Sequence, residues 1–334
     1  MANPVLVEVT RGSLVESIHR GAVAVSDSEG RLKVAIGDVE RPVFPRSALK
    51  PVQAVVLVGS GAADAYGLSD EEIALACASH SGEAMHTERI LSWLGRIDCR
   101  VSDLACGPHR PTHESSATAM IRDGVRWSEL HNNCSGKHTG FMTAARHFGA
   151  EVKGYQHHDH IVQREVESTL KDMAGLSGDL PWGVDGCTVP NFALSLSALA
   201  CAISRFADPS GLSPTRAESC GRIIRAMTAH PDLVAGTGRT CSLLMRQVPG
   251  IGVKTGAEGV YVAAVPSLGL GVALKIDDGA ARAAETAIAA LLIALGVAPD
   301  AGSAHDLAYA PVKNTRGVKA GERRPAEILA KLKL

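Results

Sequence analysis

Residues 252–276 read GVKTGAEGVYVAAVPSLGLGVALKI, and this stretch decides the fold class of the chain. It contains three apolar runs, Gly252–Lys254, Gly259–Val265 and Leu270–Ile276, each bounded by glycine or proline, as is typical of short β-strands. An Ala-rich helical pattern follows from Ala280 to Leu295. Three short strands followed by one helix need partner strands from elsewhere in the chain to complete a sheet.

The beginning of the chain supplies such strands. Apolar and polar residues alternate in Pro4–Val9, Gly21–Val25 and Arg31–Ile36, and residues 26–30 have the composition of a turn. We therefore expect strands from both ends of the chain to form one antiparallel sheet.

The middle of the chain has helical periodicity. Ser69 and Glu72 form a capping-box pattern before Ile73–Ala78. Apolar residues recur at three- and four-residue spacing in five further segments: His86–Ile97, His160–Met173, Phe192–Phe206, Pro214–Ala229 and Thr240–Gln247.

This order of elements predicts an α/β fold, with an antiparallel sheet flanked by helices and a mainly helical lobe. The sheet layer is expected from about residues 1–45 and 250–334, and the helical lobe from about residues 46–249. We interpret residues 1–334 as a single catalytic domain, with a catalytic cleft expected between sheet and lobe.

Composition excludes several classes of protein. With 34 basic and 35 acidic residues the formal net charge is −1, so the chain lacks the basic excess that binding to nucleic acid requires. The first ten residues lack a signal-peptide pattern, and the apolar run 283–297 is too short to span a bilayer. We expect a cytoplasmic protein without membrane contact. Its eight cysteines are then mostly reduced thiols, available for metal binding or nucleophilic chemistry.

The first candidate for catalysis is the S-x-x-K segment Ser47-Ala48-Leu49-Lys50, at the start of a helix. One helical turn brings the two polar side chains to the same face, where a neutral lysine can take the proton of a serine nucleophile. A second S-x-x-K occurs at residues 168–171. Because that segment lies within a helical pattern, we interpret it as solvated surface.

Two further segments support the first S-x-x-K. Lys254-Thr255-Gly256 is a K-T-G on a predicted strand, and Ser79 lies between the two motifs in sequence. This order of motifs is that of serine β-lactamases and penicillin-binding proteins. By that analogy, Ser79 of this chain could relay a proton between Lys50 and Lys254. The alternative is that Ser79 only caps the end of a helix before Gly82.

Cysteines and a lysine suggest a metal site. Cys134 and Lys137 are three residues apart at a helix start, and Asp185-Gly186-Cys187 could add a second thiolate from a turn. Two thiolates are good zinc ligands, but a lysine would have to bind as the neutral amine. The alternative is a pair of buried cysteines without metal.

The segment His157-His158-Asp159-His160 is a weaker metal candidate, because adjacent residues in an extended chain point to different sides. We interpret it as a polar helix entry with Asp159 as the N-cap.

Taken together, these residues resemble the L-asparaginase II family of the Rhizobium inducible type, which are serine-dependent amidohydrolases. The resemblance runs from about residue 5 to 325 and departs at His160-Ile161, where the family has His-Pro. The matching segments are Arg11-Gly12, Glu16-Ser17, His19-Arg20-Gly21, Phe44–Pro51, Ala78–Glu83, Asn132–His138, Val184–Cys187, Asn314–Gly317 and Gly321.

The resemblance implies a β-lactamase- or glutaminase-like fold and hydrolysis of L-asparagine to L-aspartate and ammonia, within asparagine catabolism. It implies that Ser47 is the nucleophile with Lys50 beside it, and that Ser79 and Lys254 form a second Ser–Lys pair. It also implies a homodimer.

A zinc ion held by Cys134, Lys137 and Cys187 is a further implication of the resemblance. We expect this ion to orient the substrate rather than to activate a water molecule for attack. The remaining substrate-binding candidates are Arg46, His138 and Asp185.

Two other functions compete with this one. A penicillin-recognising serine hydrolase would share the Ser–Lys machinery but usually acts outside the cytoplasm. In a non-enzymatic zinc or redox sensor, Cys134, Lys137 and Cys187 would form the functional site and the Ser–Lys pairs would be accidental.

Overall fold

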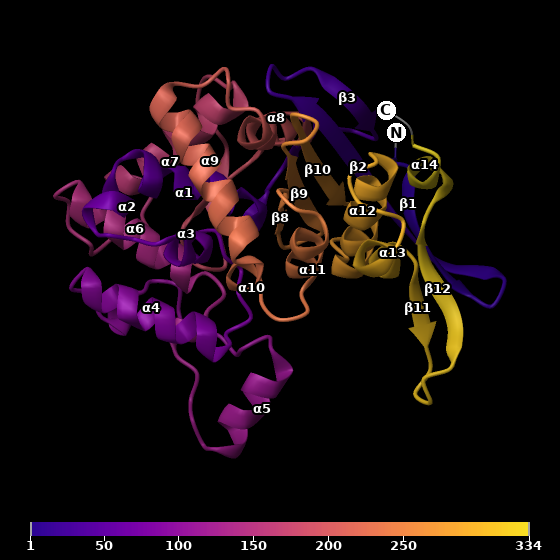
Figure 1. Ribbon diagram of the computed structural model, residues 1–334, viewed down its shortest axis with the longest axis horizontal. Coiled ribbons are helices and arrows are strands. Elements are labelled where there is room, and N and C mark those ends of the chain that lie inside the picture. The colour runs from indigo at the N-terminus through magenta and orange to yellow at the C-terminus, as the bar shows by residue number, and fades with distance from the viewer. Residues whose placement is uncertain (1, 333–334) are drawn as a thin grey trace. The chain divides into compact units, whose positions relative to one another are not determined.

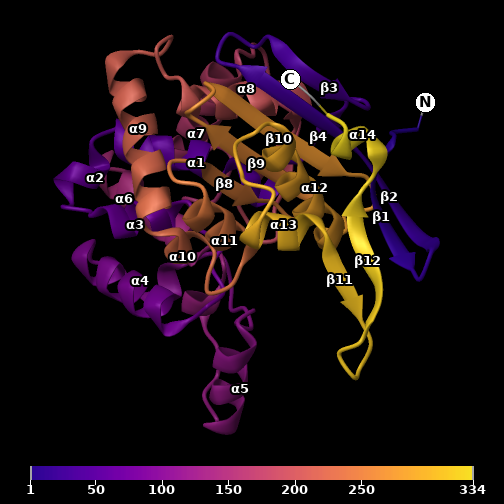
Figure 2. The ribbon, with the colours of Figure 1, turned by 45° about the vertical axis from the view of Figure 1, so that its right-hand side comes forward.

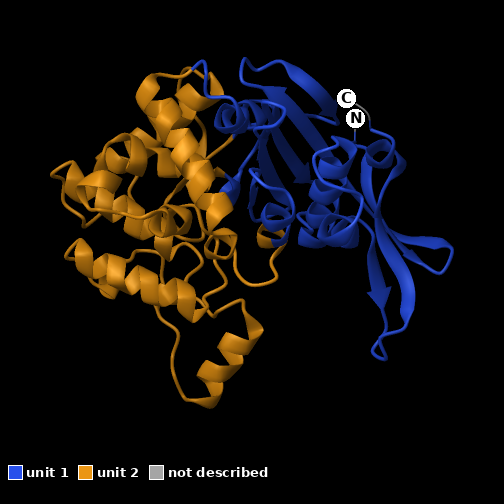
Figure 3. Cartoon of the chain, viewed as in Figure 1, with its two compact units in different colours: residues 1–48, 194–211, 243–334 blue, residues 49–193, 212–242 orange. Residues whose placement is uncertain are grey.

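A computed structural model describes residues 2–332 of the chain (Figure 1). The chain divides into two compact units (Figure 3). Unit 1 joins residues 1–48, 194–211 and 243–334, and unit 2 joins residues 49–193 and 212–242. The chain thus passes from unit 1 to unit 2 directly after Ala48, within the first S-x-x-K motif.

Unit 1 contains an eight-stranded sheet in which every neighbouring pair is antiparallel. Its strands are β1 (Val5–Arg11), β2 (Leu14–Asp27), β3 (Leu32–Ile36), β8 (Gly252–Thr255), β9 (Val260–Val265), β10 (Leu270–Ile276), β11 (Ala310–Lys313) and β12 (Lys319–Pro325). The order is β11-β12-β1-β2-β10-β9-β8, and β3 also pairs with β2. Strands from both ends of the chain therefore meet in one sheet, as predicted.

Strand β2 is the longest and joins two parts of the sheet. Its first half pairs with β1, whereas residues 21–27 pair with β10, and residues 23–26 pair with β3 on the other side. The change of partner occurs at Gly21, where a Cβ atom would collide with the carbonyl of Lys275. A glycine is therefore required at this crossing of the sheet.

Helices cover both faces of the strands in the middle of the sheet (Figure 2). Helix α8 (Leu196–Ala207) packs on β2, β9 and β10, with Gly271 of β10 directly against its backbone. Helix α12 (Ala281–Ala294) packs on β9, β10 and β12. Because both faces are covered, all six residues of β9 are buried. Unit 1 also contains β4 (Pro42–Val43), β7 (Leu194–Ser195), α13 (Gly302–Ala308) and α14 (Glu327–Ala330). The short helix η1 (Arg46–Leu49) begins in unit 1 and ends in unit 2.

Unit 2 is mainly helical. Its elements are α1 (Lys50–Gly59), α2 (Ala62–Ala65), α3 (Asp70–Ala76), α4 (Ala84–Arg96), η2 (Val101–Asp103), α5 (Glu114–Arg122), η3 (Glu129–His131), α6 (Ser135–His147), α7 (Ile161–Ala174), β5 (Trp182–Val184), β6 (Pro190–Phe192), α9 (Pro214–Ala229) and α10 (Pro231–Val234). Its core forms where α1 packs against α6, α7 and α9, and where α3 packs against α6 and α9. Helix α11 (Thr240–Gln247) begins in unit 2 and ends in unit 1.

Helix α6 is the central helix of unit 2, because Ser135 to Ala145 are all buried. It begins directly against the end of α3, where a Cβ atom on Gly136 would collide with the carbonyl of Leu75. This close approach brings the start of α6, with Cys134 and Lys137, next to the loop that follows α3.

The structure confirms the mixed α/β fold, the antiparallel sheet and the Ser69–Glu72 capping box. The helix expected over Phe192–Phe206 begins only at Leu196, because residues 190–195 form the short strands β6 and β7. This helix, α8, lies in the range expected to be helical lobe but belongs to unit 1 with the sheet. The single catalytic domain stays a prediction. Within residues 2–332, we find no helix with the length and apolar character needed to cross a membrane.

Candidate active site

Ser47 lies in unit 1, in the short 3-10 helix η1, and is half-buried. The amide of Ala48 donates a hydrogen bond of 3.1 Å to the carbonyl of Pro45, which closes a tight turn over residues 45–48, the Ser47 turn. Arg46, the preceding residue, has φ of 52°, a left-handed conformation that is uncommon for a residue with a side chain. Such strained residues cluster at functional sites.

Within unit 1, the K-T-G segment lies against this turn. Lys254 is on the edge strand β8, opposite Val262 of β9, and is 1% exposed. A Cβ atom on Gly256 would collide with the carbonyl of Pro45 and would lie 3.2 Å from the amide of Ala48. The glycine of the K-T-G is therefore needed for the close approach of the Ser47 turn to the end of β8.

Lys50 and Ser79 form a buried pair in unit 2. Lys50 is 1% exposed, and its Nζ donates a hydrogen bond of 3.0 Å to Ser79 Oγ. The same amine donates to the carbonyls of Ala78 and, at 3.4 Å, Asn133. Lys50 is thus held by oxygen atoms from two different segments, and its nitrogen points at the hydroxyl of Ser79.

Backbone hydrogen bonds fix the position of Ser79. Its amide donates to the carbonyl of Val234 at 2.9 Å, and the next amide, that of His80, donates to the carbonyl of Asn133 at 3.2 Å. Helix α3 ends at Ala76 with Cys77 as its C-cap, so the alternative in which Ser79 caps this helix is wrong. The loop after α3 instead presents the Ser79 hydroxyl to Lys50.

His80 and His86 are buried and stack on one another, with ring centroids 4.8 Å apart. Burial, and then the charges of His86 and Lys50, lower the pKa of His80 well below its usual value. Burial also lowers the pKa of His86. The His80 Nδ1 accepts the amide proton of Gly82 at 3.2 Å, so its Nε2 carries the proton and lies 2.9 Å from Ser135 Oγ. Neutral His80 therefore ties the Ser79 loop to the start of α6.

Cys134, Lys137 and Cys187 also come together in unit 2, and each is at most 5% exposed. Lys137 Nζ lies 3.0 Å from Cys187 Sγ. A hydrogen bond from Cys187 holds the pKa of Cys134 well below its usual range, and the charges of Lys50 and Lys137 act in the same direction. Donating that hydrogen bond and being buried raise the pKa of Cys187.

These three residues fit a zinc ion in the chemistry of their donors. Two thiols and an amine converge, and within residues 2–332 no group of three or more His, Cys, Asp or Glu side chains could hold a metal. A zinc ion held here would have Cys134, Cys187 and the neutral amine of Lys137 as its protein donors.

Two of the expected substrate-binding residues border this cluster. His138 is buried, and its Nδ1 lies 2.6 Å from the hydroxyl of Tyr155. Burial, and then the charge of Lys137, lower the pKa of His138 well below its usual value. Asp185 is half-buried, and its charge acts on both Lys137 and Cys187. Arg46, the third candidate, lies in unit 1.

The structure therefore gathers the candidates within each unit. Unit 2 brings Lys50 and Ser79 together, and it brings the three expected zinc ligands together. Lys50 also donates to the carbonyl of Asn133, the residue before Cys134, which joins these two groups. Unit 1 brings the Ser47 turn to the K-T-G strand.

The segment 157–160 differs from the expectation in one detail. His160, not Asp159, is the N-cap of α7, because the His160 ring accepts the amide proton of Val162. The prediction of a polar helix entry holds, but the capping group is an imidazole and the predicted Asp159 cap is wrong.

Sequence reasoning did not single out Glu83, Asn133 or Thr237, although each contacts the Ser79 loop or Lys50. Glu83 and Asn133 belong to segments that matched the family, Ala78–Glu83 and Asn132–His138, which was an available signal. Thr237 gave no such signal, because it contacts the loop only through the tertiary fold.

All eight cysteines lie within the described residues, and all are buried without a disulfide. Burial raises the pKa of Cys106 to about 12, so this thiol stays protonated at neutral pH.

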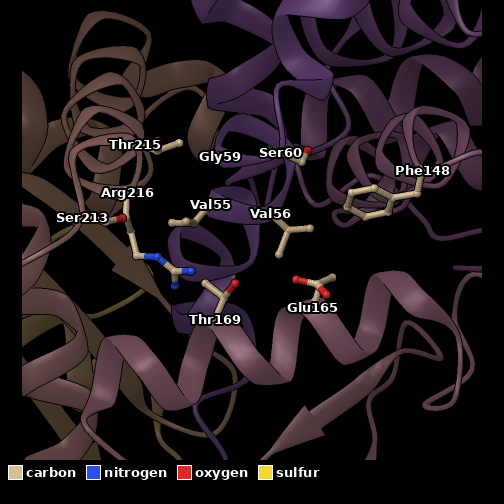
Figure 4. Close-up of a pocket in the computed structure, with 10 residues that line it drawn as sticks. All are labelled: Val55, Val56, Gly59, Ser60, Phe148, Glu165, Thr169, Ser213, Thr215 and Arg216. Atoms are coloured by element: carbon tan, nitrogen blue, oxygen red, sulfur yellow. The ribbon is translucent and has the colours of Figure 1, made fainter.

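Unit 2 also contains a cavity of about 390 Å³ that none of the expected site residues lines (Figure 4). Val55 and Val56 of α1 line it together with Thr169 and Glu165 of α7. Arg216 of α9 contributes a guanidinium group that pairs with Asp172 at 3.0 Å. We assign no catalytic group to this cavity.

Comparison with known sequences gives the class of the protein. Residues 7–325 match the L-asparaginase II family. The chain belongs to this family, and at the level of the family it is an asparaginase-type amidohydrolase. A comparison with curated proteins found no match.

Several solved structures are similar to this chain at low identity. A β-lactamase from Mycobacterium bovis is 13% identical, with 79% of this chain and 89% of that one covered and a TM-score of 0.42. A β-lactamase from Burkholderia vietnamiensis is 14% identical, with 79% and 86% covered and a TM-score of 0.38. Mglu, solved in a tris and glutamate form, is 16% identical, with 85% and 61% covered and a TM-score of 0.37. Because these TM-scores are below 0.5, we take neither activity nor substrate from these structures.

Proposed function

We propose that the protein is a serine-dependent L-asparaginase of the Rhizobium inducible type, which hydrolyses L-asparagine to L-aspartate and ammonia. Membership of the L-asparaginase II family supports the reaction class. The observation that carries the mechanism is the buried Lys50, whose amine lies 3.0 Å from the hydroxyl of Ser79. A buried lysine held by oxygen atoms is suited to moving protons.

In the proposed first step, Ser47 Oγ attacks the side-chain amide carbon of asparagine. Neutral Lys50, three residues further along the chain, takes the proton of Ser47. The negative charge that develops on the amide oxygen is stabilised by backbone N–H groups, those of Ser47 and of a residue after Lys254. The hydrogen bond that closes the Ser47 turn supports this role, because it holds the Ser47 backbone rigidly against Gly256.

In the second step, the tetrahedral intermediate breaks its C–N bond and the amide nitrogen leaves as ammonia. Ser79 and Lys254 deliver the proton that the leaving nitrogen needs. Water then attacks the ester carbon, Ser47 Oγ is released with a proton, and aspartate dissociates. The hydrogen bond from Lys50 to Ser79 supports this path, because it links the proton taken from Ser47 to the group that returns it.

Cys134, Lys137 and Cys187 complete the proposal as the ligands of a resident zinc ion. When bound, the ion would offer a remaining ligand position that can orient the α-amino or α-carboxylate end of asparagine. Arg46, His138 and Asp185 would help to position the same end of the substrate. The convergence of two thiols and one amine supports this assignment.

The decisive experiment measures ammonia release from asparagine and glutamine side by side, with the zinc content determined on the same sample. We expect turnover of asparagine and about one zinc per chain. Absence of ammonia release from either amide by the zinc-loaded protein would refute the proposed activity. Covalent labelling of Ser47 by a fluorescent penicillin, without asparagine turnover, would instead identify a penicillin-recognising hydrolase.

A chelation series tests the role of zinc separately. Removing a substrate-orienting ion should raise KM more than it lowers kcat. An equal fall in kcat and kcat/KM would assign the ion to the chemical step instead. Retention of full activity at unchanged KM after verified zinc loss would leave the ion without a part in turnover.

We also propose that the protein is a cytoplasmic homodimer. The oligomeric state can be tested with the purified chain. Light scattering coupled to gel filtration should give twice the mass of 34.8 kDa. A single species at the monomer mass would contradict the homodimer.

A further inference from the structure

Glu83 is a buried carboxylate to which the proposed reaction gives no part. Its side chain accepts three hydrogen bonds within unit 2, and the residue is 9% exposed. Ser81 Oγ donates at 2.6 Å, the amide of Thr237 at 2.9 Å and Thr237 Oγ1 at 2.7 Å. Burial alone would raise the pKa of Glu83, but these hydrogen bonds outweigh it and lower that pKa. The group is therefore an ionised acceptor that joins two distant segments of the chain.

The two segments touch closely at a glycine. Gly236 has φ of 126°, and a Cβ atom there would collide with Ser81 Oγ. Only a residue without a side chain allows segment 234–237 to pass this close to the loop 79–83. The hydrogen bonds of Glu83 therefore depend on Gly236.

Both ends of the loop 79–83 are attached to the same segment. At one end the Ser79 amide donates to the carbonyl of Val234 at 2.9 Å. At the other end Ser81 and Glu83 contact Gly236 and Thr237. Moving the second attachment would shift the first, because only residues 80–82 separate Ser79 from Glu83.

We propose that Glu83 is a positioning residue, whose carboxylate clamps the loop 79–83 onto segment 234–237 and thereby sets the distance from Ser79 Oγ to Lys50 Nζ. The assignment rests on the proposed function, because it matters for turnover only if Ser79 moves a proton. The clamp itself is a property of unit 2 and can be measured without any substrate.

Glu83→Gln tests the clamp, because an amide N–H₂ replaces one accepting oxygen and faces the donors of Thr237. Gly236→Ala tests it from the other side, because a Cβ atom there would collide with Ser81 Oγ and would lie 3.0 Å from Glu83 Oε1. Glu88→Gln is the matched control, since Glu88 is exposed on the neighbouring helix α4. We expect both test variants to lose about 100-fold in kcat with KM changed less than about threefold, because a displaced catalytic group costs about this much.

The second readout is amide hydrogen exchange at Ser79, which does not require activity. We expect exchange at least about tenfold faster than in the wild type for both test variants and unchanged for Glu88→Gln. Unchanged exchange at Ser79 in both test variants overturns the proposal whatever the activity does. A lower unfolding midpoint with unchanged kcat assigns a purely structural role and also overturns it. If the wild type does not hydrolyse asparagine, the proposed function fails while exchange still tests the clamp.

Thr237→Val replaces either test variant that does not fold. It removes the hydroxyl donor with little change of shape and leaves the backbone donor in place. We expect about a tenfold loss in kcat and a smaller rise in exchange at Ser79 than for Glu83→Gln. A Thr237→Val protein identical to the wild type in both readouts overturns the clamp.

Discussion

The chain contains the pattern S-x-x-K twice, and the two copies have very different surroundings. In the first, Lys50 is 1% exposed and donates to Ser79 and to main-chain carbonyls. In the second, in the middle of helix α7, Ser168 is exposed and 25% of the Lys171 side chain is exposed. Lys171 pairs with Glu167 at 2.7 Å, one helical turn earlier.

The difference lies in what the lysine meets. Lys171 meets the carboxylate of Glu167 near solvent, in an ordinary surface ion pair. The oxygen atoms that accept hydrogen bonds from Lys50 are neutral, two carbonyls and a hydroxyl. Spacing alone brings a serine and a lysine to one helix face, but the tertiary partners decide whether the pair can do chemistry.

The largest expected effect separates the two serines. Ser47→Ala should lower kcat for asparagine by at least about 1000-fold, because loss of a nucleophile leaves only binding and charge stabilisation. Ser168→Ala, the matched control, should stay within about twofold of the wild type. Steady-state ammonia release checks both. Near-normal turnover by Ser47→Ala would end the assignment of Ser47 as nucleophile.

The second effect separates the two lysines. Lys50→Met keeps most of the buried volume but removes the proton acceptor, so kcat should fall by about 100- to 1000-fold. Lys171→Met removes a partly exposed ion pair and should change the free energy of unfolding by less than about 1 kcal/mol, with unchanged kcat. Kinetics and urea unfolding of the two variants give the comparison. An equal fall of kcat in Lys50→Met and Lys171→Met would show that the burial of Lys50 does not matter for turnover.

The smallest effect concerns pH and stability. The pKa values of His80 and His86 are lowered in the folded protein. When the pH falls to the usual pKa of histidine, these two side chains therefore bind protons in the unfolded chain but not in the folded one. The free energy of unfolding should therefore fall by about 1–3 kcal/mol as the pH drops from about 7.5 to about 5.5. Urea unfolding at both pH values measures it. A flat or opposite dependence would contradict neutral, buried histidines.

Much of the fold could be predicted because local patterns agree with it. The strands of residues 252–276 and the Ser69–Glu72 capping box appear where glycine, proline and capping residues indicate them. Strands β11 and β12 could not be predicted in the same way. Strand β12 contains three charged side chains in a row, Glu322 to Arg324, and becomes a strand only because β1 and β11 pair with it.

The residues of the candidate site could be predicted where they belong to short sequence motifs. Cys134, Lys137 and Cys187 lie together, and Ser79 is a partner of Lys50, whereas the resemblance paired Ser79 with Lys254. The supports of the site were not predictable, because they depend on contacts between segments far apart in sequence. Glu83 and Thr237 are 154 positions apart, and no local pattern relates them.

The division of the chain into interleaved segments has a consequence during synthesis on the ribosome. Strands β1 to β3 are made first, but β10, the partner of β2, is complete only at Ile276. Until then β2 has an open edge, which is the kind of surface that recruits other chains. Gly256, which packs on the Ser47 turn, also arrives late. The nascent chain therefore has all of unit 2 before the Ser47 turn acquires its supporting strand, so under the proposed mechanism the growing polypeptide should remain inactive until translation is nearly complete.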